Sequence, residues 1–406
     1  MEVKPGYKQT EVGVIPEEWK MTAVADLVEP SAPICYGVVQ VGQHTESGVP
    51  IVAIKFVKEI AHAPLHRTAS NLEQPFARSR PTGGDVLISI KGTIGRVGIV
   101  PNGFQGNISR ELARIRIRED SCPEYIAHQL ESGATQERIM RSVVGTTRLE
   151  FSITTLRKFP LPMPPTKEEQ RAIATALSDV DGLLGGLDRL IAKKRDLKQA
   201  AMQQLLTGQT RLPGYHGEWE VKRLGEIAHI KTGSRNNEDK VEDGKYPFFV
   251  RSDIVERINS YSHDCEAILV PGEGRIGDIF HYINGRFDVH QRVYAITKFS
   301  PGIVGRFIHF YLAKNFGAWA MQNTVKATVD SLRLPTFQTF EMHLPPTEAE
   351  QTAIAEVLKD MDTELAALEQ RREKTRALKQ AMMQELLTGR TRLVARGGVE
   401  NAERKP

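Results

Sequence analysis

Cysteine is scarce in this 406-residue sequence. Cys35, Cys122 and Cys265 are far apart and odd in number, and no two of them form a CxxC pair. This spacing excludes a disulfide framework and supplies no cysteine zinc site. We therefore expect no bound metal and a chain that folds in a reducing cytoplasm.

Long hydrophobic runs are missing as well. No segment approaches the ~18 apolar residues that a membrane span needs, and the opening MEVKPGYKQTEVGVIP has no apolar core of signal-peptide length. The formal net charge is only +4. This mild excess is compatible with a nucleic-acid partner without indicating one, because solvated lysines give the same total. We expect a cytoplasmic protein with no membrane partner.

Catalytic signatures are a third absence. The sequence has no GxxxxGK[ST] phosphate loop, no HExxH and no GxSxG. His263, Asp264 and Cys265 are adjacent, but neighbouring residues of a strand point to opposite faces and cannot form a triad. We therefore expect no catalytic residue in this chain.

A long internal repeat is what the sequence does contain. PPTKEEQRAIATALSDVDGLLGGLDRLIAKKRDLKQAAMQQLLTGQTRL begins at Pro164, and PPTEAEQTAIAEVLKDMDTELAALEQRREKTRALKQAMMQELLTGRTRL begins at Pro345. The offset, 345 − 164 = 181 residues, holds without a gap, and more than half of the paired positions are identical. Shared helical composition does not give such agreement, so we infer a duplication.

Each copy carries the start and stop signals of one helix. A Thr-x-x-Glu capping box follows the two prolines, and a Gly suited to the left-handed conformation stands at the end. These residues are Thr166, Glu169 and Gly208 in the first copy and Thr347, Glu350 and Gly389 in the second. About 40 residues lie between the signals, enough for a helix of ~60 Å.

Apolar residues recur along both helices at steps of four and three, the a/d seam of a coiled coil. The seam residues are Ile173, Leu177, Val180, Leu184, Leu187 and Ile191, and then Ile354, Leu358, Met361, Leu365 and Leu368. The first seam continues on a shifted phase at Leu197, Ala201 and Leu205, and the second at Leu378, Met382 and Leu386. Two equal seams in one chain predict an antiparallel helix pair, because the intervening segment has to bring the chain back.

A mixed segment precedes each helix. Short β-rich runs such as GGDVLISI and RVYAIT alternate with helical runs such as YIAHQLESGATQERIM, so we predict an α+β protein. Its predicted parts are a first domain (1–163), a first spacer helix (164–212), a second domain (213–344), a second spacer helix (345–393) and a flexible tail (394–406). The helices are near copies, whereas the domains share only echoes such as KGTIGRVGIV and GEGRIGDIF. Such a pattern indicates that the two domains recognise different targets.

Loops in both domains combine Gly with Arg, Asn, Gln and Thr. Arg can bind guanine bidentately, Asn or Gln can bind adenine, and Gly lets the backbone approach phosphate. The candidate DNA-binding residues are Lys91, Thr93, Arg96, Asn107, Arg110, Thr147, Arg148, Arg235, Asn236, Arg251, Arg275, His290, Gln291, Arg292 and Thr328. Each Arg can equally be a solvated surface residue, and the recurring Gly-x-Ile-Gly loop can equally be a structural turn.

These motifs together resemble the DNA-specificity subunit of Type I restriction-modification enzymes. The resemblance is carried by LKQAAMQQLLTGQTRL and LKQAMMQELLTGRTRL, by the PPTKEEQ and PPTEAEQ helix starts, and by the opening TEVGVIPEEWK. It spans nearly the whole chain, from about Lys8 to Leu393.

The resemblance implies two mixed α/β target-recognition domains separated by two long helices that form an antiparallel coiled coil with pseudo-two-fold symmetry. Each domain would read one half of a bipartite site in double-stranded DNA. The helices would set the spacer and dock two methyltransferase subunits. This chain would be non-catalytic and bind no cofactor, while its methyltransferase and restriction subunit partners would use S-adenosylmethionine, ATP and Mg²⁺.

Two other readings stay open at the sequence level. A coiled-coil interaction protein could carry two domains that bind proteins or small ligands. A self-contained methylating endonuclease is disfavoured, because no methyltransferase signature is present.

Overall fold

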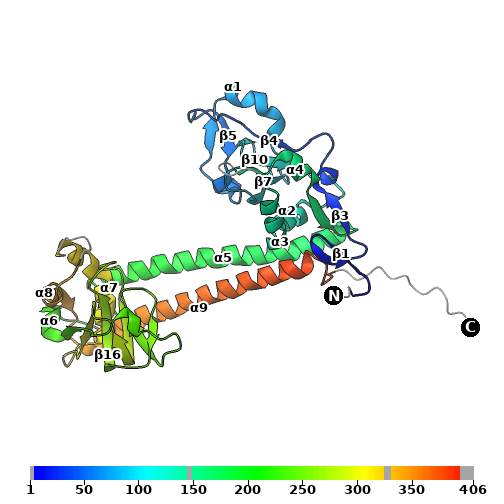
Figure 1. Cartoon of the computed structure of the whole chain (residues 1–406). Helices are drawn as coiled ribbons and strands as arrows, with labels where there is room; N and C mark the ends of the chain where they lie inside the picture. The colour runs from blue at the N-terminus through cyan, green and yellow to red at the C-terminus, as the bar shows by residue number, and fades with distance from the viewer. Residues whose placement is uncertain (1–3, 144–148, 324–330, 394–406) are drawn as a thin grey trace, which may run out of the picture. The chain divides into compact units, whose positions relative to one another are not determined.

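The computed structural model describes residues 4–143, 149–323 and 331–393 (Figure 1). The chain forms two compact units: the first holds the residues up to Gly186 and those from Arg372 on, and the second holds Leu187–Arg371. The long helices α5 (Lys167–Leu205) and α9 (Glu348–Leu386), 39 residues each, contribute one part to each unit. The five-part division drawn from the sequence therefore stays a prediction, and the tail 394–406 lies outside the described residues.

The first unit is built of short strands and helices around two cores. Its strands are β1 (Tyr7–Thr10), β2 (Gly13–Pro16), β3 (Lys20–Ala23), β4 (Cys35–Tyr36), β5 (Val49–Val52), β6 (His66–Thr68), β7 (Val86–Ser89), β8 (Val97–Ile99), β9 (Asn107–Ile108), β10 (Leu112–Ile115) and β11 (Pro160–Met163). Its helices besides α5 and α9 are α1 (Ser70–Glu73), α2 (Pro123–Glu131), α3 (Gly133–Arg141) and α4 (Ile153–Lys158), with 3-10 turns η1 (Val24–Leu27), η2 (Ile54–Phe56), η3 (Ile60–His62) and η4 (Gln74–Ser79).

Strand β10 lies inside a sheet of order β4-β10-β7-β8 and separates the two cores. Ala113 and Ile115 face one core together with Tyr125 of α2, whereas Leu112 faces a second core with Val52. Alternate residues of a strand point to opposite faces, which explains why this strand is apolar throughout most of its length.

The second unit contains a longer sheet. Its strands are β12 (Glu220–Arg223), β13 (His229–Thr232), β14 (Tyr246–Phe249), β15 (Glu256–Ile258), β16 (His263–Pro271), β17 (His281–Val289), β18 (Val293–Thr297) and β19 (Glu341–Leu344). Its other elements are α6 (Leu224–Ile227), η5 (Asn237–Asp239), α7 (Gly305–Gln322) and α8 (Leu334–Gln338). The described strands give a sheet of order β13-β18-β16-β17-β14-β15. Ile268 and Val270 of β16 share a core with Phe307 of α7, and Leu269 shares another with Phe249.

The same skeleton recurs in both units. Strand β3 pairs antiparallel with β11, and β12 pairs antiparallel with β19, so each domain begins and ends in one small ladder before its long helix. A parallel contact between β5 and β9 corresponds to the parallel contact between β14 and β17. The isolated bridges Lys91–Glu150 and Glu273–Ser331 also correspond. These matches confirm the internal repeat.

Within each unit the segments of α5 and α9 run antiparallel. In the first unit Lys379 Nζ lies 2.7 Å from Asp181 Oδ1. In the second unit Lys198 of α5 pairs with Asp362 of α9. Lys198 corresponds to Lys379 and Asp362 corresponds to Asp181 at the 181-residue offset, so this pair is the repeat equivalent of the first one. The predicted antiparallel helix pair is therefore confirmed.

The predicted continuation of the apolar seam is confirmed at Leu205 and Leu386, which are buried. It is wrong at Leu197 and Leu378, which are 46% and 55% exposed. Lys198 and Lys379 take the inner positions instead, with side chains only 22% and 16% exposed. The aliphatic stem of a lysine covers apolar surface while its ammonium group reaches a carboxylate. Charge pairing between the helices thus replaces a leucine contact that periodicity alone predicts.

The predicted capping boxes form only in part. The backbone N–H of Glu169 donates to Thr166 Oγ1, and that of Glu350 donates to Thr347 Oγ1, each at 3.3 Å. The two carboxylates bind arginines instead of the cap amides, because a guanidinium offers two charge-assisted hydrogen bonds. The stops are confirmed, since Gly208 and Gly389 adopt φ values of 70° and 69°.

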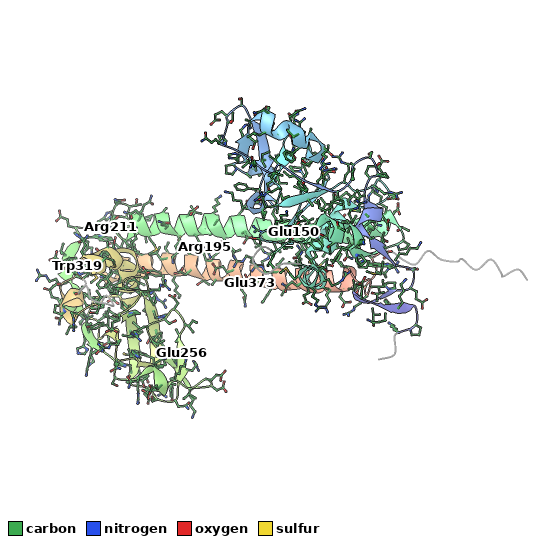
Figure 2. The ribbon with its side chains drawn as sticks, turned by 45° about the horizontal axis from the view of Figure 1, so that its top comes forward. Glu150, Arg195, Arg211, Glu256, Trp319 and Glu373 are labelled. Carbon is green, nitrogen blue, oxygen red and sulfur yellow. The ribbon has the colours of Figure 1, made fainter. Side chains whose placement is uncertain are left out.

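Each of these carboxylates ties the start of one long helix to the segment that follows the other. Arg211, which is labelled in Figure 2, binds Glu350 through Nε and Nη2, the latter at 2.6 Å from Oε2. Its guanidinium group also lies over the ring of Trp219. In the first unit Arg392 Nη2 lies 2.8 Å from Glu169 Oε2. The two pairs are related by the 181-residue offset with donor and acceptor helices exchanged.

Removing Arg211 should destabilise the second unit strongly. Glu350 is 1% exposed, so Arg211→Ala leaves a buried carboxylate without its cation and should cost about 3 kcal/mol of unfolding free energy. Arg223→Ala is the matched control, because Arg223 and Glu341 are both more than half exposed and such pairs contribute about 0–1 kcal/mol. Urea titrations of the full-length variants measure both losses, and equal losses would contradict this assignment.

Candidate nucleic-acid interface

In the first unit three predicted residues lie on the loop between β7 and β8. Ser89 Oγ holds this loop: it donates to the carbonyl of Thr93 at 2.5 Å and accepts from the backbone N–H of Arg96 at 2.8 Å. Lys91 Nζ lies 3.4 Å from Glu150 Oε1. The guanidinium of Arg96 is exposed and has no partner among the described residues. The loop therefore presents at least one uncommitted cation.

Arg110 belongs to the same edge of the first unit. The backbone N–H of Ile90 donates to the carbonyl of Glu111 at 2.8 Å, which places the start of the β7–β8 loop beside the segment that follows β9. Arg110 is half exposed, and its Nε lies 3.2 Å from Glu111 Oε1. The structure thus brings Lys91, Thr93, Arg96 and Arg110 to one region.

The corresponding loop of the second unit, between β16 and β17, reads GEGRIG. Gly274 and Gly277 have φ values of 87° and 75°, matching 70° and 85° at Gly92 and Gly95. The recurring glycines are therefore needed for the left-handed backbone of a shared turn. The stretch also fits the GxGxxG pattern, which sequence reasoning overlooked, but it leads into a strand and not into the helix that a dinucleotide site requires.

Arginines gather around one carboxylate of this second loop. Arg251 Nη1 and Arg292 Nη1 each lie 3.2 Å from an oxygen of Glu273. Arg275 is 61% exposed and pairs with Asp253. Arg275 Nε also lies 3.7 Å from Asp278 Oδ2, so three arginines and three carboxylates meet around this loop.

A second group of predicted residues surrounds Asp288. Arg235 Nε lies 3.2 Å from Asp288 Oδ2, and the amide of Gln291 donates to Asn236 Oδ1. Arg235 also forms a backbone bridge with His290, and the backbone N–H of Gly272 donates to the carbonyl of Arg292 at 2.9 Å. Those predicted residues of the second unit that the structure describes therefore meet at one edge of its sheet.

Two predicted residues are placed in the interior and not at the surface. Asn107 is fully buried; its amide donates to Glu73 Oε1 at 2.6 Å, and its Oδ1 accepts from Ser79 Oγ. His290 is 5% exposed, and its Nδ1 accepts from the backbone N–H of Arg292 at 3.0 Å. Burial, with Arg251 and Arg292 nearby, lowers the pKa of His290. Both side chains stabilise the loops, so in this structure neither is available to a base.

Three further candidates, Thr147, Arg148 and Thr328, lie outside the described residues. Sequence reasoning missed Glu273, Asp288 and Arg333, the last of which lines a small cleft with Gly272, Gln291 and Arg292. The 181-residue offset places Asp288 on Asn107, so comparing NISR (107–110) with DVHQ (288–291) position by position could have found this buried polar site.

Two buried glutamines of the long helices were also missed. Gln170 Oε1 accepts from the backbone N–H of Cys122 at 2.9 Å, and Gln351 Oε1 accepts from that of Val304 at 3.0 Å. Each amide also donates to a proline carbonyl six residues before it, at 3.3 Å. The first turn of each long helix therefore fixes the start of α2 or α7.

A comparison with protein families decides what this architecture is. The model of the "Type I restriction modification DNA specificity domain" matches twice, over residues 16–191 and 216–377. The chain belongs to this family. Each match takes in one domain with a large part of the long helix that follows it.

Curated relatives of the specificity family agree with this assignment. The putative Type I restriction enzyme MjaX specificity subunit of Methanocaldococcus jannaschii is 25% identical over 95% of this chain and 97% of its own. The EcoBI specificity subunit of Escherichia coli is 25% identical over 48% of this chain, and the alignment spans only 43% of that subunit.

Solved specificity subunits share the fold. A crystal structure of the S subunit of a Type I restriction-modification system from M. genitalium superposes with a TM-score of 0.67 over 95% of this chain and 98% of that one, at 16% identity. A chain from a structural study of complex assembly in the type I system gives 0.54 over 93% and 99%, at 18% identity. Both confirm the two-domain architecture with long helices.

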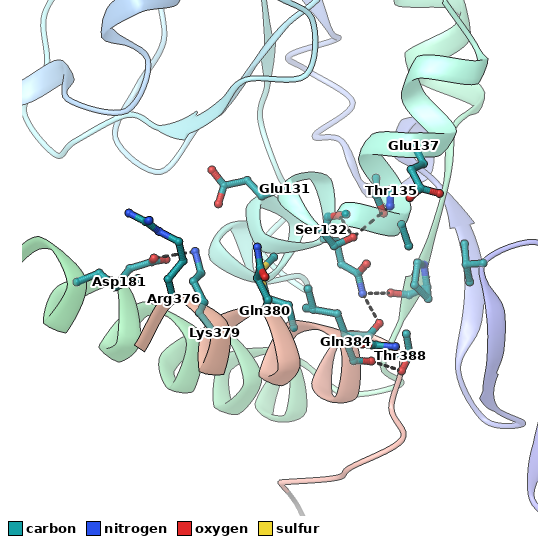
Figure 3. Close-up of a pocket in the computed structure, with 18 of the residues that line it drawn as sticks. Glu131, Ser132, Thr135, Glu137, Asp181, Arg376, Lys379, Gln380, Gln384 and Thr388 are labelled. Atoms are coloured by element: carbon teal, nitrogen blue, oxygen red, sulfur yellow. Dashed lines mark hydrogen bonds and ion pairs between the residues drawn. The ribbon is translucent and has the colours of Figure 1, made fainter. Parts of the chain in front are cut away.

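The first unit of this specificity protein also contains a cleft of about 690 Å³ where α2, α3, α5 and α9 meet (Figure 3). Gln129 joins its walls by donating to the carbonyl of Leu387 at 2.7 Å. Asp181, on the opposite side, is already paired with Lys379. Neither a metal-ligand cluster nor a helix long and apolar enough to cross a membrane occurs in the part of the chain that the structure describes.

Acid should weaken the Asp288 site in a defined way. Burial raises the pKa of this carboxyl, but hydrogen bonds from Ser260, Ser262, the N–H of Val289 and Arg235 lower it further, so that the net pKa lies below 3.8. A lowered pKa means that the ionised group stabilises the fold above about pH 4 and that this contribution disappears as pH falls through the folded value.

Asp288→Asn, which installs the residue of the other unit, should cost about 1–3 kcal/mol at pH 7. The difference in melting temperature from the unsubstituted protein should shrink below about pH 4. Asp264→Asn is the control, because Asp264 and its partner Arg286 are both 53% exposed. A difference for Asp288→Asn that stays constant down to pH 3 would rule out the charged network.

Proposed function

We propose that this chain is the non-catalytic sequence-recognition subunit of a Type I restriction-modification enzyme, and that each domain reads one half of a bipartite DNA site. The observation that carries the proposal is a shared skeleton with unlike side chains at its loop edge. Lys91 corresponds to Glu273, and Arg110 corresponds to Gln291. A duplicated fold with different surface chemistry suits two different half-sites.

The proposed base-reading groups are held ready by neighbouring side chains. The amides of Asn236 and Gln291 pair with each other, and amides of this kind can instead pair with adenine. Arg251 and Arg292 are oriented by Glu273, and an oriented guanidinium suits guanine or phosphate. In the first domain the guanidinium groups of Arg96 and Arg110 would bind guanine or phosphate.

The long helices would set the spacing between the half-sites. A helix of 39 residues is ~58 Å long, whereas one turn of duplex DNA is roughly 34 Å. Ion pairs at the 181-residue offset hold α5 and α9 together within each unit. A paired helix is stiffer than a single one and could keep two reading heads at a constant separation.

Two methyltransferase subunits would dock at equivalent surfaces on the two halves. Leu197 and Leu378 occupy equivalent positions, 378 − 197 = 181, and are 46% and 55% exposed. The partner subunits would use S-adenosylmethionine, ATP and Mg²⁺, whereas this chain would contribute recognition. Partners that share the phosphate contacts would also explain a net charge of only +4.

Methylation-sensitive sequencing of host DNA, with and without this gene, tests recognition and spacing together. A bipartite adenine-methylated sequence should appear only with the gene.

Insertion of four residues after Leu187 and after its repeat counterpart Leu368 adds ~6 Å to each helix. The spacer should lengthen by about one or two base pairs while both half-sites stay the same, since a base pair rises ~3.4 Å. Methylation that does not depend on the DNA sequence would contradict the proposal. A coiled-coil protein that binds other proteins would then be favoured.

Each leucine variant should lose the binding of one methyltransferase subunit. Leu197→Asp and Leu378→Asp should each reduce the complex from two methyltransferase subunits to one, and the double variant should bind none, because a carboxylate in an apolar contact is costly to desolvate. Val221→Asp is the control, since Val221 is 55% exposed on the short strand β12. Native mass spectrometry counts the subunits. A double variant that still binds two subunits would exclude these leucines as docking residues.

A further inference from the structure

A cleft of about 440 Å³ in the first unit is lined by four arginines and no acidic residue. It lies between β4, η4 and β10, and its cationic residues are Arg78, Arg80, Arg114 and Arg116. Polar residues at its edge are Ser31, Tyr36 and Thr82. Its size falls within the range of small-ligand pockets, roughly 300–1,000 Å³.

Two of the four guanidinium groups are neutralised. Arg80 binds Glu73 through Nε at 2.8 Å and Nη2 at 2.5 Å. Arg116 binds Asp85 in the same manner at 2.9 and 2.8 Å. Both carboxylates are thereby occupied by one arginine each, so neither is left to balance another cation.

Arg114 has no such partner. It is 2% exposed, and its Nη2 donates to the carbonyl of Pro33 at 3.0 Å and contacts Cys35 Sγ at 3.5 Å. Its Nε and Nη1 are buried and meet no acceptor among the described residues. No described carboxylate forms an ion pair with it, and a buried charge without a counter-charge is costly.

The second unit shows that the fold does not require this cation. Strand β18 corresponds to β10, and the 181-residue offset places Ala295 at the position of Arg114. At the positions that correspond to the Asp85–Arg116 pair, the second unit has Ala267 opposite Thr297. The same sheet position is therefore filled by a small apolar residue in one half and by a buried guanidinium in the other.

We propose that this arginine cleft is a phosphate-binding site, in which Arg114 at the inner wall and the exposed Arg78 bind a phosphate group. Guanidinium groups match the geometry and charge of phosphate oxygens, and the burial of Arg114 strengthens its interaction with an anion. The phosphate belongs either to the DNA backbone or to a free phosphorylated ligand. Only the first source depends on the proposed function.

Melting of the full-length protein in increasing pyrophosphate tests the site. Pyrophosphate should raise the melting temperature of the unsubstituted protein progressively, because a ligand that binds only the folded state stabilises it. Arg114→Ala, which copies Ala295, and Arg78→Ala should abolish the increase. Arg141→Ala should retain it, because Arg141 is an exposed residue of α3 paired with Glu137. Arg78 is exposed, so its variant remains informative if Arg114→Ala does not fold.

DNA binding by the assembled complex at several salt concentrations distinguishes the two sources. If the phosphate is from DNA, Arg78→Ala should lower the slope of log affinity against log salt by about one, and pyrophosphate should compete with DNA. If it is a free ligand, the slope should stay the same while the pyrophosphate response is lost. An unsubstituted protein that does not respond to pyrophosphate, with an unchanged slope in both variants, would overturn the proposal. A pyrophosphate response in a protein that reads no DNA sequence would sink only the proposed function.

Discussion

A buried carboxylate at the start of each long helix is the constraint on which the rest of each unit depends. Glu169 and Glu350 cannot remain ionised in the interior without a cation, and the arginine that satisfies each one comes from beyond the end of the other helix. The requirement fixes the direction of the helix pair. The glycine stop beside it is also packed closely, since a Cβ at Gly389 would lie 2.6 Å from Pro16 and 3.1 Å from Trp19.

Around the candidate DNA-binding loops, some polar side chains are buried and support the loops, whereas others lie at the surface. Asn107 and Asp288 occupy equivalent buried positions, and each accepts from the backbone N–H of the next residue, at 2.8 and 3.0 Å. They shape the turn that carries Arg110 in one domain and Gln291 in the other. An equivalent framework with different surface residues allows two domains of one fold to present different hydrogen-bonding groups.

The sequence predicts the parts whose causes are local. The long helices, their glycine stops and their antiparallel pairing follow from spacing and duplication, and the structure has all three. The contacts of Leu197 and the burial of His290 could not be predicted in this way. The first depends on which residue of the opposite helix carries a carboxylate, and the second on a loop folding over the imidazole. Arg114 gave no signal, because alternate charged residues on a strand are usually read as a solvated face.

The ladders that join β3 to β11 and β12 to β19 have a consequence for how such a protein can change. Lys20 pairs with Met163 and Glu220 pairs with Leu344, so the chain leaves the scaffold and returns to it at adjacent residues. The intervening domain can then be altered, lengthened or replaced without moving either attachment. Each domain can therefore diversify as an exchangeable module, while the two long helices stay as they are.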